Sequence, residues 1–201
     1  MKITQQDYDT IVFLTRLVYY DLNYPEPFKC VKQIEIYSGL KLNIFDMDEY
    51  ELFVICGTNS LRDWITNFKV GLGITPAQYD QAYYYVKNNT PTSGKPIVIC
   101  GHSLGGGIAE YVASQMYFHD TVCVTLNGCG SKHLIHPVLR EVETLNVITE
   151  HDILNNMTRF LPFKNYMKHT GKEVIVDDDY FFPLSIRSHC DFRNFTKYVV
   201  K

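Results

Sequence analysis

A chain of 201 residues, of which 46% are hydrophobic and 14% aromatic, is long enough to bury a substantial core. We therefore expect a single domain over residues 1–201. The formal net charge of −3 offers no basic surface of the kind that binds nucleic acid, so no nucleic-acid partner is expected.

The N-terminal part of the chain predicts one helix and three strands. Apolar residues recur at helical spacing over residues 4–20, and the prolines that follow end this element. Strand patterns come next, at 33–38, 40–46 and 51–56. Ser38-Gly39 suits a hairpin turn between the first two, which indicates an antiparallel edge of the sheet.

From residue 76 onward, helix and strand patterns alternate. The expected helices cover 76–87, 104–118, 134–142 and 190–199, and the expected strands cover 96–100, 121–126, 144–149 and 173–176. Such alternation is typical of an α/β protein with a mostly parallel sheet and helices on both faces.

The cysteines and the N-terminus bear on the compartment. Three of the six cysteines, Cys56, Cys100 and Cys123, lie in apolar strand patterns, and none forms a C-x-x-C pair, so we expect free thiols in a reducing compartment. The polar N-terminus lacks the apolar core of a signal peptide. The sequence also contains no run of about 18 apolar residues, which is the length needed to span a membrane. The sequence thus favours a cytoplasmic protein, at least where it is made, without a transmembrane segment.

Residues 98–109 carry the most informative motif, V-I-C-G-H-S-L-G-G-G-I-A. A β-branched strand pattern leads into Gly-x-Ser-x-Gly, which opens directly into a helix pattern, and this is the context of a nucleophile elbow. Ser103 is therefore the candidate nucleophile. The backbone N–H of Leu104 lies at the helix N-terminus, where it can stabilise a developing oxyanion.

A serine nucleophile needs a base and an acid, which in an α/β-hydrolase follow the serine in chain order, each after a later strand. Asp152 follows the strand at 144–149 and is the preferred acid, although an aspartate here could instead cap a helix. Glu150 is the alternative acid. His189 follows the strand at 173–176, at the head of the last expected helix, and is preferred as base over His169.

Three further features bear on the site. Thr58, at the junction that follows the strand at 51–56, is the candidate for the second oxyanion N–H. Apolar residues alternate around two glycines just beyond it, which indicates either a mobile flap or acyl-binding wall or a half-buried extended segment; the substrate-binding candidates there are Phe68, Val70 and Leu72. The acidic run at 177–179 is more typical of a solvated turn than of a cation site.

Two segments in this order resemble the class 3 lipase family. The first is V-I-C-G-T-N-S-L-R-D-W at 54–64, and the second is G-H-S-L-G-G at 101–106; the similarity extends to T-L-N-G-C-G at 125–130 and to the residues around Asp152. The resemblance implies an α/β-hydrolase fold, the triad Ser103, Asp152 and His189, and an oxyanion hole at Thr58 and Leu104. It also implies that the Asp-Trp pair at 63–64 fixes the loop that carries Thr58.

The chain departs from that family in ways that concern the substrate. Cys56 stands where the family usually has arginine, and the family's V-H-x-G-F segment is missing before the elbow. The chain is also compact for the family.

Taken together, these features predict a serine hydrolase that cleaves carboxylic esters through an acyl-enzyme, without a metal or an organic cofactor. The expected partner is a lipid, such as an acylglycerol or a phospholipid, or a small ester, and transient contact with a membrane surface is compatible with this. The same triad would also serve an amidase, a thioesterase or an acyltransferase. A catalytically silent hydrolase-fold binding protein is the alternative of a different class.

Overall fold

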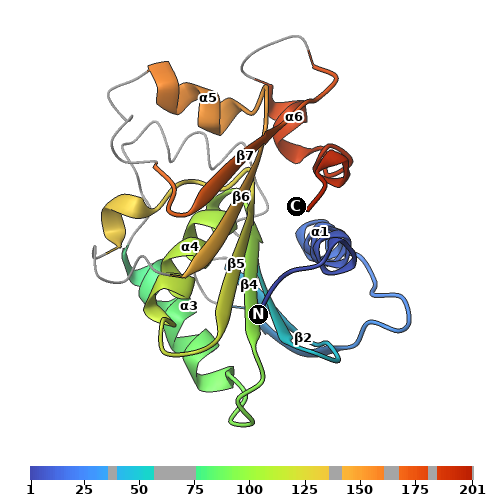
Figure 1. The fold of residues 1–201 in the computed structure, drawn as a ribbon, viewed down its shortest axis with the longest axis vertical. Helices are drawn as coiled ribbons and strands as arrows, with labels where there is room; N and C mark the ends of the chain where they lie inside the picture. The colour runs from blue at the N-terminus through green and yellow to red at the C-terminus, as the bar shows by residue number, and fades with distance from the viewer. Residues whose placement is uncertain (36–39, 57–75, 136–141, 161–167, 181–184, 201) are drawn as a thin grey trace.

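The computed structural model describes residues 1–35, 40–56, 76–135, 142–160, 168–180 and 185–200 (Figure 1). Its framework is a sheet in which the strands lie side by side in chain order. The seven strands are β1 (Cys30–Glu35), β2 (Lys41–Asp46), β3 (Glu51–Cys56), β4 (Ile97–His102), β5 (Thr121–Leu126), β6 (Glu143–Thr149) and β7 (Lys172–Val176). β1, β2 and β3 pair antiparallel, and all pairs from β3 to β7 are parallel. This confirms the expected mostly parallel sheet with an antiparallel N-terminal edge.

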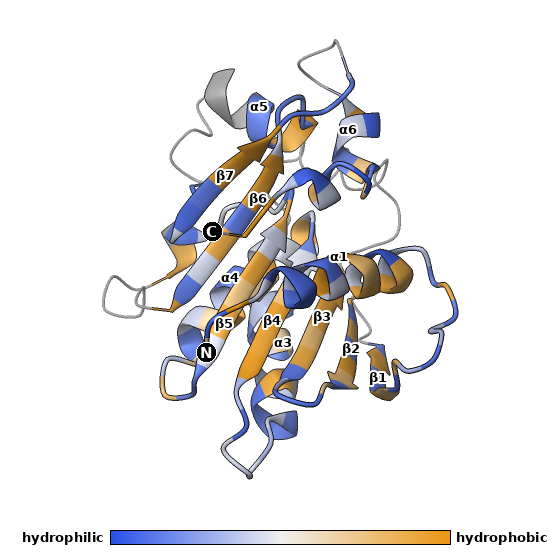
Figure 2. Ribbon diagram, turned by 45° about the vertical axis from the view of Figure 1, so that its right-hand side comes forward, coloured by the Kyte–Doolittle hydropathy of each residue, from blue (hydrophilic) through white to orange (hydrophobic). Residues whose placement is uncertain are grey.

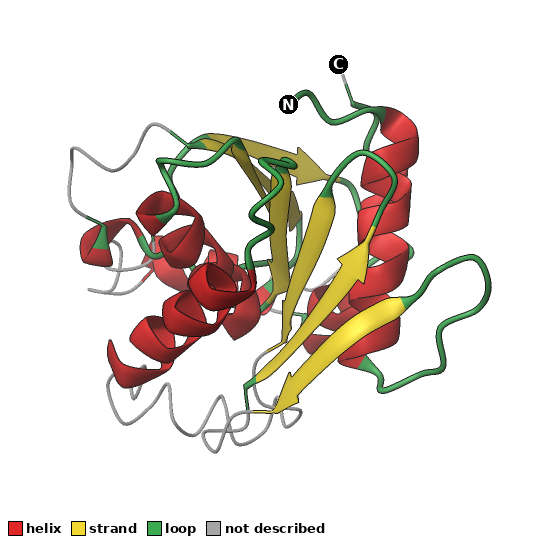
Figure 3. Cartoon of the chain, turned by 90° about the horizontal axis from the view of Figure 1, so that it is seen from below, coloured by secondary structure: helices red, strands yellow, loops and turns green. Residues whose placement is uncertain are grey.

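Helices cover both faces of the sheet (Figure 3). The α-helices are α1 (Gln5–Tyr19), α3 (Pro76–Asn89), α4 (Leu104–Gln115), α5 (Ile153–Phe160) and α6 (Ile186–Cys190), and the 3-10 turns are η1 (Lys132–Leu134) and η4 (Phe195–Lys197). α3 and α4 pack on one face, and α1 and η4 pack on the other. The site described below therefore stands on a sheet that is shielded from water on both sides.

The central strands are hydrophobic along most of their length (Figure 2). Successive side chains point to opposite faces, as the period of a strand requires. In β4, Ile97 and Ile99 pack toward α3 and α4, whereas Val98 and Cys100 pack toward α1. Each strand thus contributes to two cores, which accounts for its unbroken apolar run rather than an alternating one.

The two ends of the chain meet on the α1 face (Figure 3). Thr4 begins α1 with a capping box, in which its Oγ accepts from the backbone N–H of Asp7 and the Asp7 carboxylate accepts from the backbone N–H of Thr4. Gln5 donates to the carbonyl of Tyr198 and accepts from the backbone N–H of Val200. The C-terminal segment is thereby tied to the first helix.

One expected helix was placed wrongly, and most of another lies outside the described residues. The helix expected over 134–142 is replaced at its start by η1, after which Ile135 is extended; residues 136–141 lie outside the described part of the chain. The helix expected over 190–199 is wrong because helix comes earlier, in α6, where the Ser185 hydroxyl accepts from the N–H of Ser188 and so fixes the start. α6 ends at Cys190, because the following residue, Asp191, leaves the helical region at φ −87° and ψ 92°.

Candidate active site

Ser103 lies at a sharp turn between β4 and α4. Its backbone has φ 58° and ψ −127°, a conformation that residues other than glycine seldom adopt. The turn is held from two sides, because the N–H of Ser103 donates to the carbonyl of Leu126 (3.2 Å) and its carbonyl accepts from the N–H of Cys129 (3.0 Å). Strained backbone that neighbouring strands hold in place is characteristic of a nucleophile elbow.

The glycines of the motif permit the close packing of this turn. A Cβ at Gly101 would lie 2.3 Å from the carbonyl oxygen of Gly105, and a Cβ at Gly106 would lie 2.7 Å from Cα of Gly128. Both contacts are with backbone, which cannot move aside as a flexible side chain could. The motif is therefore a steric requirement of the elbow as well as a recognisable pattern.

Asp152 follows β6, and its two carboxylate oxygens have different partners. Oδ1 accepts from the backbone N–H and from the side-chain amide of Asn155, each at 2.7 Å. Oδ2 is hydrogen-bonded to Nδ1 of His189. Asp152 thus caps the start of α5, as one interpretation of the sequence expected, while its other oxygen binds His189.

His189 lies near the end of α6, not at the head of a later helix as expected. Its side chain and that of Asp152 are fully buried, and their hydrogen bond joins segments that are 37 residues apart. Because a carboxylate can only accept, Nδ1 carries the proton of this bond, and in a neutral ring Nε2 then bears the lone pair. Among the described residues, Nε2 has no hydrogen-bond partner.

His102, the residue before Ser103, links the elbow to His189. The ring centroids of the two histidines are 4.7 Å apart, and Nε2 of His102 lies 2.7 Å from the backbone carbonyl oxygen of His189. Burial and the neighbouring His189 hold the pKa of His102 well below its usual value, so the ring is neutral and Nε2 donates. His102 therefore positions the backbone of His189 and adds no charge to the site.

Asn127, just after β5, fastens the segment 185–191, which contains α6 and His189 and is called the histidine loop below. Its backbone is also left-handed, with φ 44°, a region that asparagine tolerates better than most residues. Its side-chain amide donates to the carbonyl of His189 (3.2 Å) and to Oγ of Thr149 (2.9 Å), and its side-chain oxygen accepts from the backbone N–H of Thr149 (2.8 Å). The ends of β5 and β6 and the histidine loop are thus joined by one side chain.

Asp178 holds the histidine loop from the other side. Its side chain is fully buried and accepts from the backbone N–H of His151 (3.0 Å), from Nδ1 of His151 (2.6 Å) and from Oγ of Ser188. Burial raises the pKa of Asp178, but these hydrogen bonds outweigh it, so the pKa lies below its usual value. The prediction of a solvated turn is therefore wrong at this residue, whose carboxylate is a structural acceptor, whereas Asp177 and Asp179 are exposed.

Of the oxyanion and substrate-binding candidates, only Leu104 lies among the described residues. Leu104 is the first residue of α4, where the backbone N–H has no carbonyl of its own helix to bond. Its amide is thus placed beside Ser103, where an oxyanion would form. The other candidates lie in 57–75, outside the described residues: Thr58 for the oxyanion hole, Phe68, Val70 and Leu72 for substrate, and the Asp-Trp pair at 63–64.

The alternative acid and base lie elsewhere. Glu150 is exposed, and its backbone N–H pairs with β7. His169 is buried, but its Nδ1 faces Glu110 at 3.5 Å and its Nε2 faces Asn155 at 3.3 Å. Both ring nitrogens of His169 are therefore directed at neighbouring side chains, unlike those of His189.

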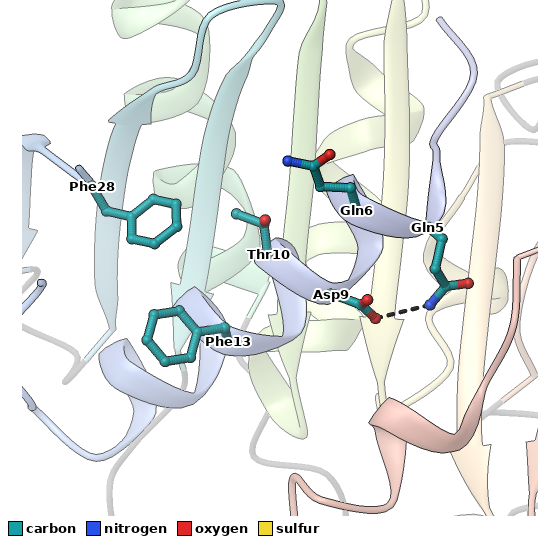
Figure 4. A pocket seen from close by; sticks show the side chains of 6 residues that line it. All are labelled: Gln5, Gln6, Asp9, Thr10, Phe13 and Phe28. Atoms are coloured by element: carbon teal, nitrogen blue, oxygen red, sulfur yellow. Dashed lines mark hydrogen bonds between the residues drawn. The ribbon is translucent and has the colours of Figure 1, made fainter. Parts of the chain in front are cut away.

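Metal clusters and surface hollows are the other places where a functional site could lie. In the described ranges, no group of three or more His, Cys, Asp or Glu side chains could hold a metal ion. A hollow on the outer side of α1 contains one carboxylate, which accepts from Gln5, and its described lining includes no serine, cysteine or histidine (Figure 4). It is lined by Gln5, Gln6, Asp9, Thr10, Phe13 and Phe28.

Sequence reasoning missed the residues that hold the acid and the base in place: Asn127, Thr149, Asp178 and Ser188. One signal was present, because the T-L-N-G-C-G segment that resembled the lipase pattern includes Asn127. The others are single polar residues in segments without a motif. Only their burial in the folded protein reveals them.

Comparisons with known proteins agree on a lipase-like relationship. The sequence profile of the Tle-like phospholipase domain, a phospholipase-like family, matches residues 28–136. An extracellular phospholipase A1 from Serratia liquefaciens is 38% identical over 93 residues, which are 46% of this chain and 28% of that protein. The match thus spans less than a third of that relative's length. The profile match includes the elbow with Ser103 but ends before Asp152 and His189.

Solved structures show the fold independently of sequence. A mutant form of MDLA from Penicillium cyclopium superposes with a TM-score of 0.56 at 11% identity, covering 93% of this chain and 86% of that one. A fungal lipase gives a TM-score of 0.54 at 12% identity, with 88% and 82% covered. The sheet and its helices are thus of the α/β-hydrolase type. Within the described residues, no helix is both long and apolar enough to cross a bilayer.

Proposed function

Because the chain belongs to the Tle-like phospholipase domain family, we propose that it hydrolyses the carboxylic esters of phospholipids with Ser103 as nucleophile. The observation that carries the proposal is the buried hydrogen bond between Asp152 and His189, beside an elbow that presents Ser103 at positive φ. His189 keeps Nε2 without a partner among the described residues, and a general base needs such a nitrogen.

The proposed reaction begins with proton transfer. His189 removes the hydroxyl proton of Ser103 through Nε2 as Oγ attacks the acyl carbonyl carbon. Asp152 holds the ring in the tautomer with Nδ1–H and stabilises the imidazolium that forms. His189 then gives its proton to the leaving alcohol, and the acyl group remains on Ser103.

Water completes the cycle. His189 takes a proton from the water, whose oxygen attacks the acyl-enzyme, and the fatty acid leaves as Ser103 recovers its proton. The backbone N–H of Leu104 is proposed to stabilise both oxyanions, together with that of Thr58. Loss of one such donor costs about 10²–10³ in turnover in serine hydrolases.

The first test is covalent labelling with a fluorophosphonate, followed by measurement of the intact mass. The wild type should gain one adduct, and Ser103→Ala should gain none. Ser114→Ala is the matched control, because Ser114 is a buried serine of the same helix whose Oγ donates to the carbonyl of Tyr111. This control should label like the wild type.

The second test identifies the bond that is cleaved. Phospholipid vesicles incubated with the wild type should yield fatty acid and lysophospholipid, and Ser103→Ala should yield neither. Diacylglycerol as the product would instead indicate cleavage of the phosphate ester. A folded wild type that neither labels nor hydrolyses any ester would overturn the proposal in favour of a binding protein.

A further inference from the structure

Glu110 and His169 form a second buried pair, deep in the molecule. Both side chains are almost fully buried, and Nδ1 of His169 lies 3.5 Å from Oε2 of Glu110. Glu110 also accepts from the backbone N–H and Oγ of Ser131 (3.0 and 3.2 Å) and from the backbone N–H and Oγ of Thr170. Burial raises the pKa of Glu110, but His169 and Thr170 outweigh it and lower the pKa below its usual value, so the group is a carboxylate.

A line of contacts runs from this pair to the proposed acid. Nε2 of His169 lies 3.3 Å from Oδ1 of Asn155, and Nδ2 of Asn155 lies 2.7 Å from Oδ1 of Asp152. A carboxylate can only accept a hydrogen bond, so the amide nitrogen of Asn155 must face Asp152 and the amide oxygen must face His169. Nε2 of His169 therefore carries a proton.

The two nitrogens of His169 have different surroundings. Nδ1 faces Oε2 of Glu110 at 3.5 Å but has no hydrogen-bond partner among the described residues. The hydrogen bond of the ring is therefore the one from Nε2 to the amide oxygen of Asn155.

We infer that His169 is a positioning residue for the proposed reaction, which it serves by orienting Asn155 and, through Asn155, the carboxylate of Asp152. The inference rests on the proposed function. The backbone N–H of Asn155 already caps α5 by donating to Oδ1 of Asp152, so the fold does not need the side-chain amide for that purpose. The amide adds a second donor to the same oxygen, which directs the other oxygen at His189.

Two substitutions of His169 separate this role from packing. The amide nitrogen of glutamine takes the place of Nε2, so His169→Gln keeps the donor to Asn155. The amide nitrogen of asparagine takes the place of Nδ1, so His169→Asn keeps only a nitrogen that faces Glu110 and loses the donor to Asn155. We expect fluorophosphonate to label Ser103 about 10-fold more slowly in His169→Asn than in the wild type, and His169→Gln to rescue most of that loss.

Asn155→Ala is the second test of the inference, and it leaves the contact between Glu110 and His169 in place. It should slow labelling by about 10-fold as well. In this background, asparagine and glutamine at position 169 should give equal labelling rates, because the route to Asp152 is cut. The labelling rates are compared per active site. The urea midpoint of every variant is measured as well, so that a loss of stability can be told from a loss of reactivity.

A readout other than activity is the low-field proton resonance of Nδ1–H in His189. It should shift in His169→Asn and in Asn155→Ala, and should stay near the wild-type position in His169→Gln. Equal rates and resonances for the two His169 variants in the wild-type background, or rates that only follow the urea midpoints, would overturn the inference. A wild type that fails to label would instead count against the proposed function, and the resonance would still test the role of His169.

Discussion

His189 and His169 are both buried, both face a buried carboxylate, and both lie outside the chain segment that the family profile matches. They differ in the second ring nitrogen. Nε2 of His189 has no partner among the described residues, whereas Nε2 of His169 faces the amide oxygen of Asn155. His189 can therefore accept a proton at Nε2, whereas His169 donates a hydrogen bond from Nε2 to Asn155.

This difference shows that burial beside a carboxylate does not by itself mark a catalytic histidine. His151 makes the same point, because its Nδ1 contacts the buried carboxylate of Asp178 in a pair that holds the histidine loop. What sets His189 apart is that Nδ1 binds the carboxylate while Nε2 has no partner among the described residues, in a ring next to His102, which precedes Ser103. A general base requires both a vacant nitrogen and proximity to its nucleophile.

The largest effect on activity is expected from loss of the hydrogen bond between Asp152 and His189. Asp152→Asn should lower kcat on a phospholipid or a soluble ester by up to about 10⁴-fold, because the amide favours the wrong tautomer of His189. Steady-state kinetics measures this. The matched control is Glu150→Gln, whose side chain is exposed, and it should stay within about 2-fold of the wild type. Near-normal activity in Asp152→Asn would mean that another residue is the acid.

Loss of the contact between Glu110 and His169 should affect the free energy of unfolding more than it affects kcat. Glu110→Gln removes a buried carboxylate that faces His169 and accepts hydrogen bonds from Ser131 and Thr170, and loss of one partner from a buried pair destabilises by about 3–5 kcal/mol. Urea unfolding should show this loss, while kcat per folded molecule should fall by no more than about 10-fold. A drop in kcat as large as that of Asp152→Asn would erase the distinction between the two pairs.

The smallest effect concerns Asp178 and depends on pH. The native pKa of Asp178 is lowered, so near pH 4 the unfolded chain binds more protons at this group than the native protein does. Its contribution to stability is therefore complete above the unfolded pKa of about 3.9 and is lost as the pH falls through the lower native pKa. Asp178→Asn should reduce the free energy of unfolding by about 2 kcal/mol at pH 7.

Urea titrations at several pH values measure the difference in the free energy of unfolding between the wild type and Asp178→Asn. The gap between wild type and Asp178→Asn should narrow as the pH falls below about 4, because the wild-type carboxylate then becomes protonated. A gap that stays constant across this range would show that the carboxylate charge does not stabilise the histidine loop.

Much of the fold and part of the site could be predicted from the sequence. The strand at 51–56 and the strand at 121–126 were predicted with the bounds that β3 and β5 have. Ser103 was selected by its motif, and Asp152 and His189 by their order after later strands; the structure brings the last two into contact. The rule works because parallel strands end at one edge of the sheet, so residues that follow them lie close together.

The final helix shows where such reasoning fails. Apolar and aromatic residues at 192–199 suggested a helix, but Phe192, Phe195 and Tyr198 pack against α1 and the sheet from a chain with only a short 3-10 turn. Tertiary packing overrode local preference there. His189 thus contacts Asp152, although the helix expected to follow it was placed wrongly.

The sequence by itself determined the succession of strands and helices and the elbow at Ser103, because strand patterns, helix periodicity and glycine spacing are properties of neighbouring residues. The tertiary structure decided between the acids and bases that the order of the strands left open, and it alone paired Glu110 with His169. Asp152 meets His189 across 37 residues, and Glu110 meets His169 across 59. Such contacts depend on how the carboxyl ends of the strands and the helices come together in space, which local patterns do not record.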